Sequence, residues 1–438
     1  MGLGAHGGKY ELAPETGAVA AGGDTMQSRR SFLRSAAVSA VISRSVLGAN
    51  DRVRMGLIGC GTRGSMVSGF FGRHKDSVFV AACDVAKTRL EQTVAKLSEG
   101  GAVVDGYEDY RRLLERKDID GVLIATPDHW HSPMMVDACA AGKDVYVEKP
   151  VSNTIEAAQK MVDAARRHNR VVQVGLQQRQ GEKFKEAAKL IQDGLLGKVT
   201  HVVLQFPASY TTPPEPEMQP PPDLNWDMFQ GPAERHPYKP SRQRRWRAYY
   251  DYGGGLVTDW GVHLVDVAHW YLGADSRAPL LTSASAQYVN VPNPERDQAP
   301  DVFVVSWQYD DFVMSFTNAV MTSPEFPLNG NLFYGPRGSL LVNRSGYLVR
   351  PAQARRIPGR PEPPPPIEAR IARFEENYEN DPDTIAHARN FLDCVKSRQK
   401  PVSGIEIGFH STLPCLLGIL AIRAGRSFTW DGKVAKPA

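Results

Sequence analysis

The chain has 438 residues, of which 42% are hydrophobic and 23% charged, and its formal net charge is +4. This length is too great for one ordinary core and predicts at least two domains, and the composition is that of a soluble globular protein. The small net charge argues against nucleic acid or a membrane surface as the main partner. The five cysteines lack CxxC or CxxxC spacing, which indicates reduced thiols and no cysteine zinc site.

Residues 1–49 are predicted to be an N-terminal extension that carries an export signal. The segment 28–34 reads Ser-Arg-Arg-Ser-Phe-Leu-Arg and precedes a weakly apolar stretch over 36–47. This pattern is similar to a twin-arginine signal, with a basic disordered tail as the alternative. We therefore expect Met26 to be the true start, the twin-arginine machinery to be a partner of the precursor, and the protein to be periplasmic or otherwise exported. No other run approaches membrane length.

A buried strand is expected at 53–58, and a glycine-rich turn and a helix follow it. This strand–turn–helix context makes the GxGxxG pattern a dinucleotide-binding signal. Gly59 allows the tight turn, Gly61 lets the backbone approach a pyrophosphate, and Gly64 permits close helix–strand packing. The residues predicted to hold the phosphates are Gly59, Gly61, Thr62, Arg63 and Gly64.

The next expected strand, 78–83, ends at Asp84, twenty residues beyond Gly64. A carboxylate at this point accepts hydrogen bonds from the adenosine ribose and repels the extra phosphate of NADP. The sequence therefore predicts NAD, although Arg89 leaves some room for NADP. A helix cap is the alternative role for Asp84.

Strands and helices continue to alternate up to Gly175. Helices are expected at 110–116, 132–141 and 155–168, and strands at 121–126, 144–147 and 171–175. This alternation predicts an α/β fold in which residues 50–175 form a Rossmann domain with a doubly wound parallel sheet. Ligands bind at the carboxyl ends of such strands, where Asp84, the segment 126–131 and the segment 148–150 follow.

The combination of Glu148-Lys149-Pro150, Thr126-Pro127 with His131, and the glycine turn is specific. It resembles the Gfo/Idh/MocA family, the glucose–fructose oxidoreductase and inositol dehydrogenase group, from Val53 to about Trp430. The twin-arginine segment and the sequence Asp259-Trp-Gly-Val-His263 make the exported bacterial branch the nearest.

The resemblance implies roles for several of these residues. It implies that Lys149 lies beside the nicotinamide and touches the substrate hydroxyl, and that Pro150 often follows a cis peptide bond. It also implies that Thr126, Pro127, His131 and Glu148 line the cofactor site. The spacing of the loop histidines His129 and His131 could suggest metal ligands, but it also matches the family's Thr-Pro-x-x-x-His pattern, in which the histidine, here His131, lines the cofactor site, so no metal is expected.

Residues 176–438 are predicted to form an α+β domain. Extended segments at 199–206, 281–289, 302–309, 312–318, 331–334 and 339–342 indicate an open, mostly antiparallel sheet. In the family, the free face of this sheet often forms a dimer or tetramer interface. A helical part near 381–424 is expected to pack back on the first domain, and the proline-rich stretches 213–222 and 361–366 are expected to be surface arms.

Two segments of this domain carry candidate substrate residues. The resemblance places Gln178 and Arg179 near the substrate, with a solvated loop as the alternative. The basic run 242–247 reads as a solvated surface, but its aromatic neighbours Trp246 and Tyr252 suggest a sugar-stacking rim.

A helix after Gly253-Gly-Gly255 places Asp259, His263 and Asp266 at i, i+4 and i+7, on one face. A carboxylate one turn from a histidine orients it and raises its basicity, as in a general base. A structural brace and a metal site remain alternatives, and the resemblance favours the catalytic pair.

The predicted reaction is hydride transfer between NAD and a hydroxyl-bearing carbon of a sugar, glycoside or cyclitol. In this hypothesis His263, oriented by Asp259, removes the hydroxyl proton and Lys149 stabilises the oxygen. One alternative is an exported glycosidase that keeps NAD tightly bound and oxidises its substrate transiently. Another is a non-catalytic NAD- or sugar-binding protein.

Overall fold

The computed structural model describes residues 52–291, 293–319, 327, 329–353, 365, 367–375, 377 and 379–438. They all belong to one compact unit that spans 49–438. The twin-arginine segment, the expected start at Met26 and most of the proline-rich stretch 361–366 lie outside the described residues.

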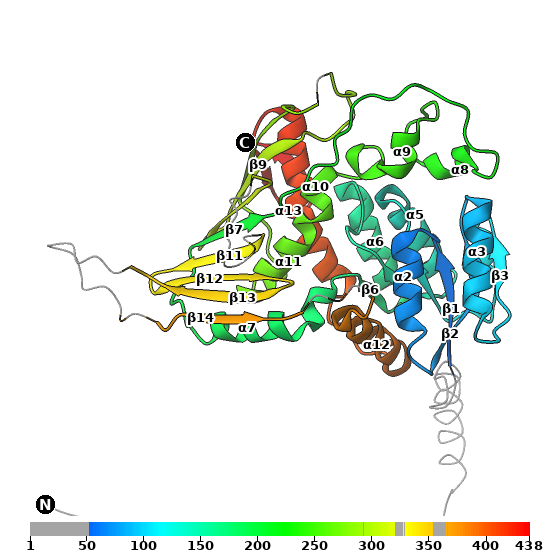
Figure 1. The fold of residues 1–438 in the computed structure, drawn as a ribbon, viewed down its shortest axis with the longest axis horizontal. Coiled ribbons are helices and arrows are strands. Elements are labelled where there is room, and N and C mark those ends of the chain that lie inside the picture. Colours follow the sequence, from blue (N-terminus) through cyan, green and yellow to red (C-terminus); the bar gives the residue numbers. More distant parts are fainter. Residues whose placement is uncertain are drawn as a thin grey trace, which may run out of the picture. The chain divides into compact units, whose positions relative to one another are not determined.

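The first sheet has six strands in the order β3-β2-β1-β4-β5-β6 (Figure 1). The strands are β1 (Val53–Ile58), β2 (Ser77–Cys83), β3 (Asp105–Tyr107), β4 (Gly121–Ile124), β5 (Asp144–Val147) and β6 (Val172–Val174). All five pairings are parallel. β4 and β5 are buried along their whole length because helices cover both faces of a doubly wound sheet. This confirms the predicted Rossmann architecture.

The helices that alternate with these strands are α2 (Thr62–Phe71), α3 (Lys87–Ser98), α4 (Tyr110–Leu114), α5 (Asp128–Ala140) and α6 (Ile155–His168). α6 shows how the sequence sets such a helix. Thr154 caps its first turn by accepting a hydrogen bond from the amide of Ala157, and Asn169 ends it in the left-handed conformation. α5 begins four residues earlier than expected, because Asp128 already follows the turn at Pro127.

The second sheet has ten strands in the order β14-β13-β12-β11-β7-β10-β9-β8-β15-β16. Six were expected: β7 (His201–Gln205), β8 (Leu281–Gln287), β9 (Val302–Gln308), β10 (Val313–Thr317), β11 (Gly330–Gly335) and β12 (Gly338–Asn343). Four were missed: β13 (Gly346–Pro351), β14 (Arg370–Arg373), β15 (Phe428–Trp430) and β16 (Ala435–Pro437). Only β7 and β10 pair in parallel, so the sheet is mostly antiparallel, as predicted. The proline-rich stretch 213–222 contains neither helix nor strand.

The helical segments of this part are η2 (Gln177–Gln180), α7 (Glu182–Gln192), α8 (Trp226–Gln230), α9 (Pro240–Arg244), η3 (Trp246–Ala248), α10 (Gly255–Asp259), α11 (Gly261–Tyr271), α12 (Pro382–Ser397) and α13 (Ile405–Ala424). α12 packs beside α2, and α13 packs on both α6 and α11 (Figure 1). The last two long helices therefore join the nucleotide-binding sheet to the second sheet.

The apolar helix α13 contradicts the expectation that no run beyond the N-terminal signal approaches membrane length. Its 20 residues are long and apolar enough to cross a membrane, and it is the one such helix among the described residues. Within the fold, 67% of its most apolar window is buried, and side chains such as Leu417 and Ala421 are fully enclosed. A core helix of a soluble protein meets the same length and composition criteria.

Candidate active site

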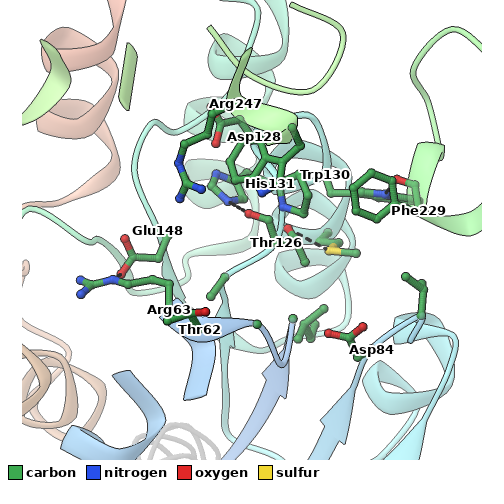
Figure 2. A pocket seen from close by; sticks show the side chains of 18 of the residues that line it. Thr62, Arg63, Asp84, Thr126, Asp128, Trp130, His131, Glu148, Phe229 and Arg247 are labelled. Atoms are coloured by element: carbon green, nitrogen blue, oxygen red, sulfur yellow. Dashed lines mark hydrogen bonds and ion pairs between the residues drawn. The ribbon is translucent and has the colours of Figure 1, made fainter. Parts of the chain in front are cut away.

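A cavity of about 680 Å³ lies at the carboxyl ends of the parallel strands. It brings together most of the site residues predicted from the sequence. Those that line it are Gly59, Gly61, Thr62, Arg63, Asp84, Thr126, Pro127, His131, Glu148, Lys149, Trp246, Asp259 and His263. Figure 2 shows the glycine-turn residues and Asp84 on one side, with His131, Trp130 and Arg247 across the cavity.

The glycine turn between β1 and α2 has the shape that a pyrophosphate needs. Gly59 has φ +94°, and a side chain there would lie 2.7 Å from the carbonyl oxygen of Ala125. A Cβ at Gly61 would meet no atom within 4 Å, so the backbone there is open to the cavity. The first turn of α2 has no side-chain cap and no acidic residue, which leaves its amide groups free for an anion. The turn therefore fits a dinucleotide.

Substitutions at Gly61 and Gly64 should separate an effect on cofactor binding from an effect on folding. A Cβ at Gly64 would lie 1.9 Å from the carbonyl oxygen of Gly59, whereas one at Gly61 would contact no protein atom. We expect Gly61→Ala to keep the melting temperature of the cofactor-free protein and to weaken NAD binding at least about tenfold, because the methyl group occupies the place of the phosphates. Gly64→Ala should lower the melting temperature. Thermal denaturation and a fluorescence titration with NADH check both, and equal NADH affinity in Gly61→Ala and wild type would contradict this role.

Asp84 follows β2 and does not cap the next helix: the N-cap of α3 is Ala86, without a side-chain cap. Its carboxylate accepts hydrogen bonds from the amides of Cys60 and Ala86, both at 2.8 Å, and it also lines the cavity. Burial raises the pKa of Asp84, and the two amides and the nearby Arg89 oppose that rise. The carboxylate therefore braces the glycine turn at the position where a ribose would lie.

The charge of Asp84 should set the preference between the two dinucleotides. We expect Asp84→Asn to weaken NADH binding and to reduce the discrimination against NADPH about tenfold or more, since hydrogen bonds to charged groups contribute about 1.5–3 kcal/mol each. Arg89, which also lines the cavity, should then help to bind the extra phosphate. Parallel titrations with NADH and NADPH measure this ratio, and an unchanged ratio would remove Asp84 from cofactor selection.

The two histidines of the segment 126–131 lie on α5 and not in a loop. Nε2 of His129 is 3.1 Å from the carbonyl oxygen of Phe229. The ring nitrogens of His131 lie 2.7 Å and 2.9 Å from the carbonyl oxygens of Pro150 and Thr126. Burial lowers the pKa of both rings, and that of His129 falls to about 4. Backbone carbonyls thus occupy both ring nitrogens of His131 and Nε2 of His129, and His131 joins two of the strand ends that form the cavity.

Lys149 leaves the end of β5 next to a cis peptide bond with Pro150. Its Nζ donates to Oδ1 of Asp259 at 2.5 Å and to the carbonyl oxygen of the same residue at 2.7 Å. The neighbouring Glu148 accepts from Nε of Arg63 at 2.8 Å, within the wall of the cavity (Figure 2). The strand end therefore presents a buried lysine to the second half of the fold.

Asp259 ends α10 and is the centre of a network that includes Lys149. Nε of Arg247 lies 3.2 Å from its Oδ1, and the hydroxyl of Tyr210 donates to its Oδ2. Burial alone would raise the pKa of Asp259, but the Lys149 and Arg247 cations hold it well below its usual value. Asp259 is therefore an ionised carboxylate that positions the Lys149 ammonium group.

The predicted pairing of Asp259 with His263 is wrong. The helix breaks at Trp260, between α10 and α11, and no hydrogen bond joins the two side chains in the part of the chain that the structure describes. Nδ1 of His263 is buried without a partner, which leaves Nε2 as the nitrogen open to the cavity. Burial, and then the nearby cations Lys149 and Arg344, lower the pKa of His263 well below its usual value. Asp259 does raise the pKa of His263, as expected of a nearby carboxylate, but burial and the cations outweigh it, so the net shift favours the neutral ring.

Three other predicted residues do not reach the cavity. Arg179 is 4% exposed and forms buried ion pairs with Asp266 and Asp275, so Asp266 belongs to neither a metal site nor the catalytic face. Gln178 borders a separate small cavity, and its neighbour Gln177 lines the main one. Tyr252 is fully buried in an aromatic cluster with Trp226 and Phe229. Trp246, by contrast, lies at the cavity as expected.

Several functional candidates were not identified from the sequence. Arg247 was part of the run interpreted as solvated, yet it lines the cavity near Asp128 and holds Asp259 (Figure 2). Burial raises the pKa of Asp128 well above its usual value, with Arg247 opposing the rise. The other additions are Tyr210 and Arg344. The aromatic neighbours of the basic run 242–247 were the one feature of the sequence that could have indicated a functional role for Arg247.

Two family models match the chain. The model for the oxidoreductase family with an NAD-binding Rossmann fold, GFO_IDH_MocA, matches residues 53–176. The model for the C-terminal alpha/beta domain of the same family matches residues 180–343.

Curated relatives match part of the chain, and solved structures share its fold. Glycosyl hydrolase family 109 protein 2 of Shewanella sp. strain ANA-3 is 35% identical over 156 residues, which are 34% of this chain and 34% of that protein. The protein of the same family from Saccharopolyspora erythraea is 30% identical over 158 residues, 34% of each chain. Thus the alignment spans about a third of these relatives. The WlbA dehydrogenase from Bordetella pertussis, in complex with NADH and UDP-GlcNAcA, superposes with TM-score 0.62 at 19% identity over 86% of this chain and 99% of its own. A levoglucosan dehydrogenase in complex with NADH and levoglucosan gives TM-score 0.64 at 18% identity, with 86% and 99% covered.

Proposed function

Because this chain belongs to the Gfo/Idh/MocA oxidoreductase family, we propose that it transfers a hydride between a sugar, glycoside or cyclitol and NAD. The observation that carries this proposal is a single cavity in which an open glycine turn, a partly buried Lys149–Asp259 pair and a buried His263 with a lowered pKa lie together. The first feature fits a dinucleotide, and the other two fit a hydroxyl group that is losing a proton. NADH-bound dehydrogenases of the same fold support this assignment.

The residues of the cavity divide the chemistry between them. When bound, NAD supplies the hydride acceptor, and the glycine turn and Asp84 would hold it. Lys149 donates a hydrogen bond to the substrate hydroxyl oxygen and stabilises its developing negative charge. Nε2 of His263 accepts the hydroxyl proton, which its neutral ring can do at physiological pH.

Asp259 acts in this scheme through Lys149 and not through His263. Its two oxygens bind the lysine, Arg247 and Tyr210, so the carboxylate is fixed from three sides. A fixed carboxylate keeps the ammonium group of Lys149 in one place while the substrate binds, which is the preorganisation that electrostatic catalysis requires. Asp259 is therefore a positioning residue.

A second candidate function is glycoside hydrolysis through transient oxidation, in which the cofactor stays bound and is regenerated. The observation that favours it is the similarity to the glycosyl hydrolase family 109 proteins. In this scheme the oxidation acidifies the neighbouring C–H bond, the aglycone leaves, water adds and the hydride returns. The same Lys149 and His263 would serve the oxidation and the final reduction.

One experiment separates these functions. The protein is purified without added cofactor, its near-ultraviolet absorbance is recorded, and a panel of glycosides and free sugars is supplied. NADH or keto-sugar in stoichiometric amount supports the dehydrogenase, and free sugar without net NADH supports the glycosidase. Absence of turnover with every compound, despite bound NAD, would overturn both and favour a binding protein.

We further propose that the protein is exported with its cofactor already bound. The twin-arginine pattern at 28–34 supports this proposal, because that machinery carries folded proteins. We expect Arg29→Lys with Arg30→Lys to retain the protein in the cytoplasm, as cell fractionation would show. Recovery of a peptide from 1–25 in the precursor would contradict Met26 as the start.

We also propose a dimer or tetramer through the open face of the second sheet, which light scattering would test.

A further inference from the structure

Arg344 lies at the boundary between the main cavity and a second, smaller one. It follows β12 and lines both the main cavity and a neighbouring cavity of about 90 Å³. Its guanidinium carbon lies 4.6 Å from the centre of the Trp260 ring, and that ring lies 5.9 Å from the ring of His263. Arg344 and His263 therefore both lie beside the Trp260 ring and both line the main cavity.

Arg344 differs from the other cations at this end of the cavity because it has no carboxylate partner. The other three are paired: Arg63 with Glu148, and Lys149 and Arg247 with Asp259. The charge of Arg344 opposes the rise in the pKa of Asp383, but Asp383 forms its ion pair with Lys183, and among the described residues the Arg344 side chain has neither an ion pair nor a hydrogen bond. A guanidinium group at a cavity wall without a hydrogen-bond acceptor offers its donors to a ligand.

The small cavity supplies a second polar group beside Arg344. Gln178 is 4% exposed and borders this cavity, and its Oε1 has no hydrogen-bond partner. Such buried unpaired amides are uncommon in folded proteins and indicate a missing partner. The rings of Phe206 and Trp260 are stacked with their centres 3.6 Å apart, and Phe206 provides an apolar wall for the same cavity.

We infer that Arg344 and Gln178 form a subsite for the carboxylate of an anionic sugar, so that the substrate is a uronic acid or a uronide. This inference rests on the proposed function, because it assumes that the sugar reacts beside Lys149 and His263. The planar fork of an arginine matches a carboxylate with two parallel hydrogen bonds. The unpaired Oε1 of Gln178 is an acceptor, so it suits a hydroxyl group of the same sugar while Arg344 binds the carboxylate.

The test compares matched sugars by calorimetric titration of the full chain loaded with NADH. The probes are uronic acids and the corresponding neutral hexoses of the gluco, galacto and manno series, together with the corresponding 6-sulfates. We expect at least one uronic acid to bind about 10- to 100-fold more tightly than its neutral partner, as a charge-assisted bidentate hydrogen bond predicts. Arg344→Gln should abolish this difference, and Arg344→Lys should restore part of it.

Arg423→Gln is the matched control. Arg423 also lies over an aromatic ring, 5.0 Å from the centre of Tyr250, but it is exposed and lines neither cavity. This variant should keep the wild-type preference. Equal binding of acid and neutral sugar in all three pairs, or an equal loss for both in Arg344→Gln, would overturn the inference. Tighter binding of the sulfates alone would overturn the carboxylate assignment.

The same samples separate this inference from the proposed function. Arg344-dependent uronate binding without oxidation of any sugar would leave the subsite standing and refute hydride transfer. Turnover of neutral sugars without a preference for uronates would refute the subsite and leave hydride transfer standing.

Discussion

Replacement of Lys149 by methionine is expected to lower kcat about 10²- to 10³-fold while leaving NADH affinity within about twofold of wild type. Methionine keeps the length of the side chain but removes the donor that faces the reacting oxygen. The ammonium group lies 2.5 Å from Oδ1 of Asp259, and Lys149 and His263 both line the cavity. The loss should therefore fall on the chemical step, and steady-state kinetics with an NADH titration measure it.

Lys183→Met is a matched control for this variant. Lys183 forms another buried lysine–aspartate pair, 3.3 Å from Asp383, and does not line the main cavity. It should lose stability comparable to that lost by Lys149→Met but keep its kcat. Wild-type activity in Lys149→Met would remove Lys149 from the mechanism. Equal loss of kcat in the two variants would attribute the effect to folding.

Replacement of His263 by alanine should lower kcat about 10²- to 10⁴-fold, the range that general acid–base groups contribute. The pH profile adds a test that a structural role would not pass. Burial and the Lys149 and Arg344 cations lower the pKa of His263, so its neutral form persists as the pH falls through 6.5, where an ordinary histidine becomes charged. We therefore expect kcat to stay level through this pH range and to fall only in more acidic solution.

His129→Gln is the control for His263. It removes a buried histidine whose pKa is also lowered, to about 4, but which bonds to the carbonyl of Phe229 and does not line the cavity. Its kcat should remain near that of the wild type. An acidic fall in wild-type kcat centred near 6.5 would contradict a neutral His263, and full activity of His263→Ala would exclude it as the base.

The nucleotide-binding half could be predicted from the sequence because its signals are local. The glycine turn, the acidic residue after β2 and the Glu148-Lys149-Pro150 sequence all lie at strand ends whose positions follow from the hydrophobic pattern. The parallel sheet then brings these strand ends to one edge. The structure differs from the prediction in this half mainly at the start of α5 and in the short edge strand β3, which was not expected.

The second half could not be predicted to the same depth because its contacts are long-range. Helical periodicity correctly indicated a helix near 259–266 but not its break at Trp260. Because α10 ends at Asp259 and α11 begins at Gly261, the spacing of a continuous helix does not hold between Asp259 and His263. The partners of Asp259 come from Tyr210 and Arg247, which no spacing rule connects to it. Arg179 was predicted near the substrate, yet it forms ion pairs with Asp266 and Asp275, which lie far from it in the sequence. Charge partners are set by the fold, and a single sequence does not show them.

Hydride transfer to a nicotinamide dinucleotide in this cavity can be tested directly. The test is a single turnover of the NAD-loaded protein with a sugar that the protein binds and that carries deuterium at its hydroxyl-bearing carbons. Mass spectrometry of the released cofactor and sugar then locates the label. Under the dehydrogenase scheme, deuterium remains on C4 of the nicotinamide. Under the transient oxidation scheme, deuterium returns to the oxidised carbon of the sugar, and the neighbouring carbon that loses its proton exchanges its deuterium with solvent; Lys149→Met blocks both outcomes. Product that forms with neither deuterium on the cofactor nor exchange at the neighbouring carbon would contradict hydride transfer.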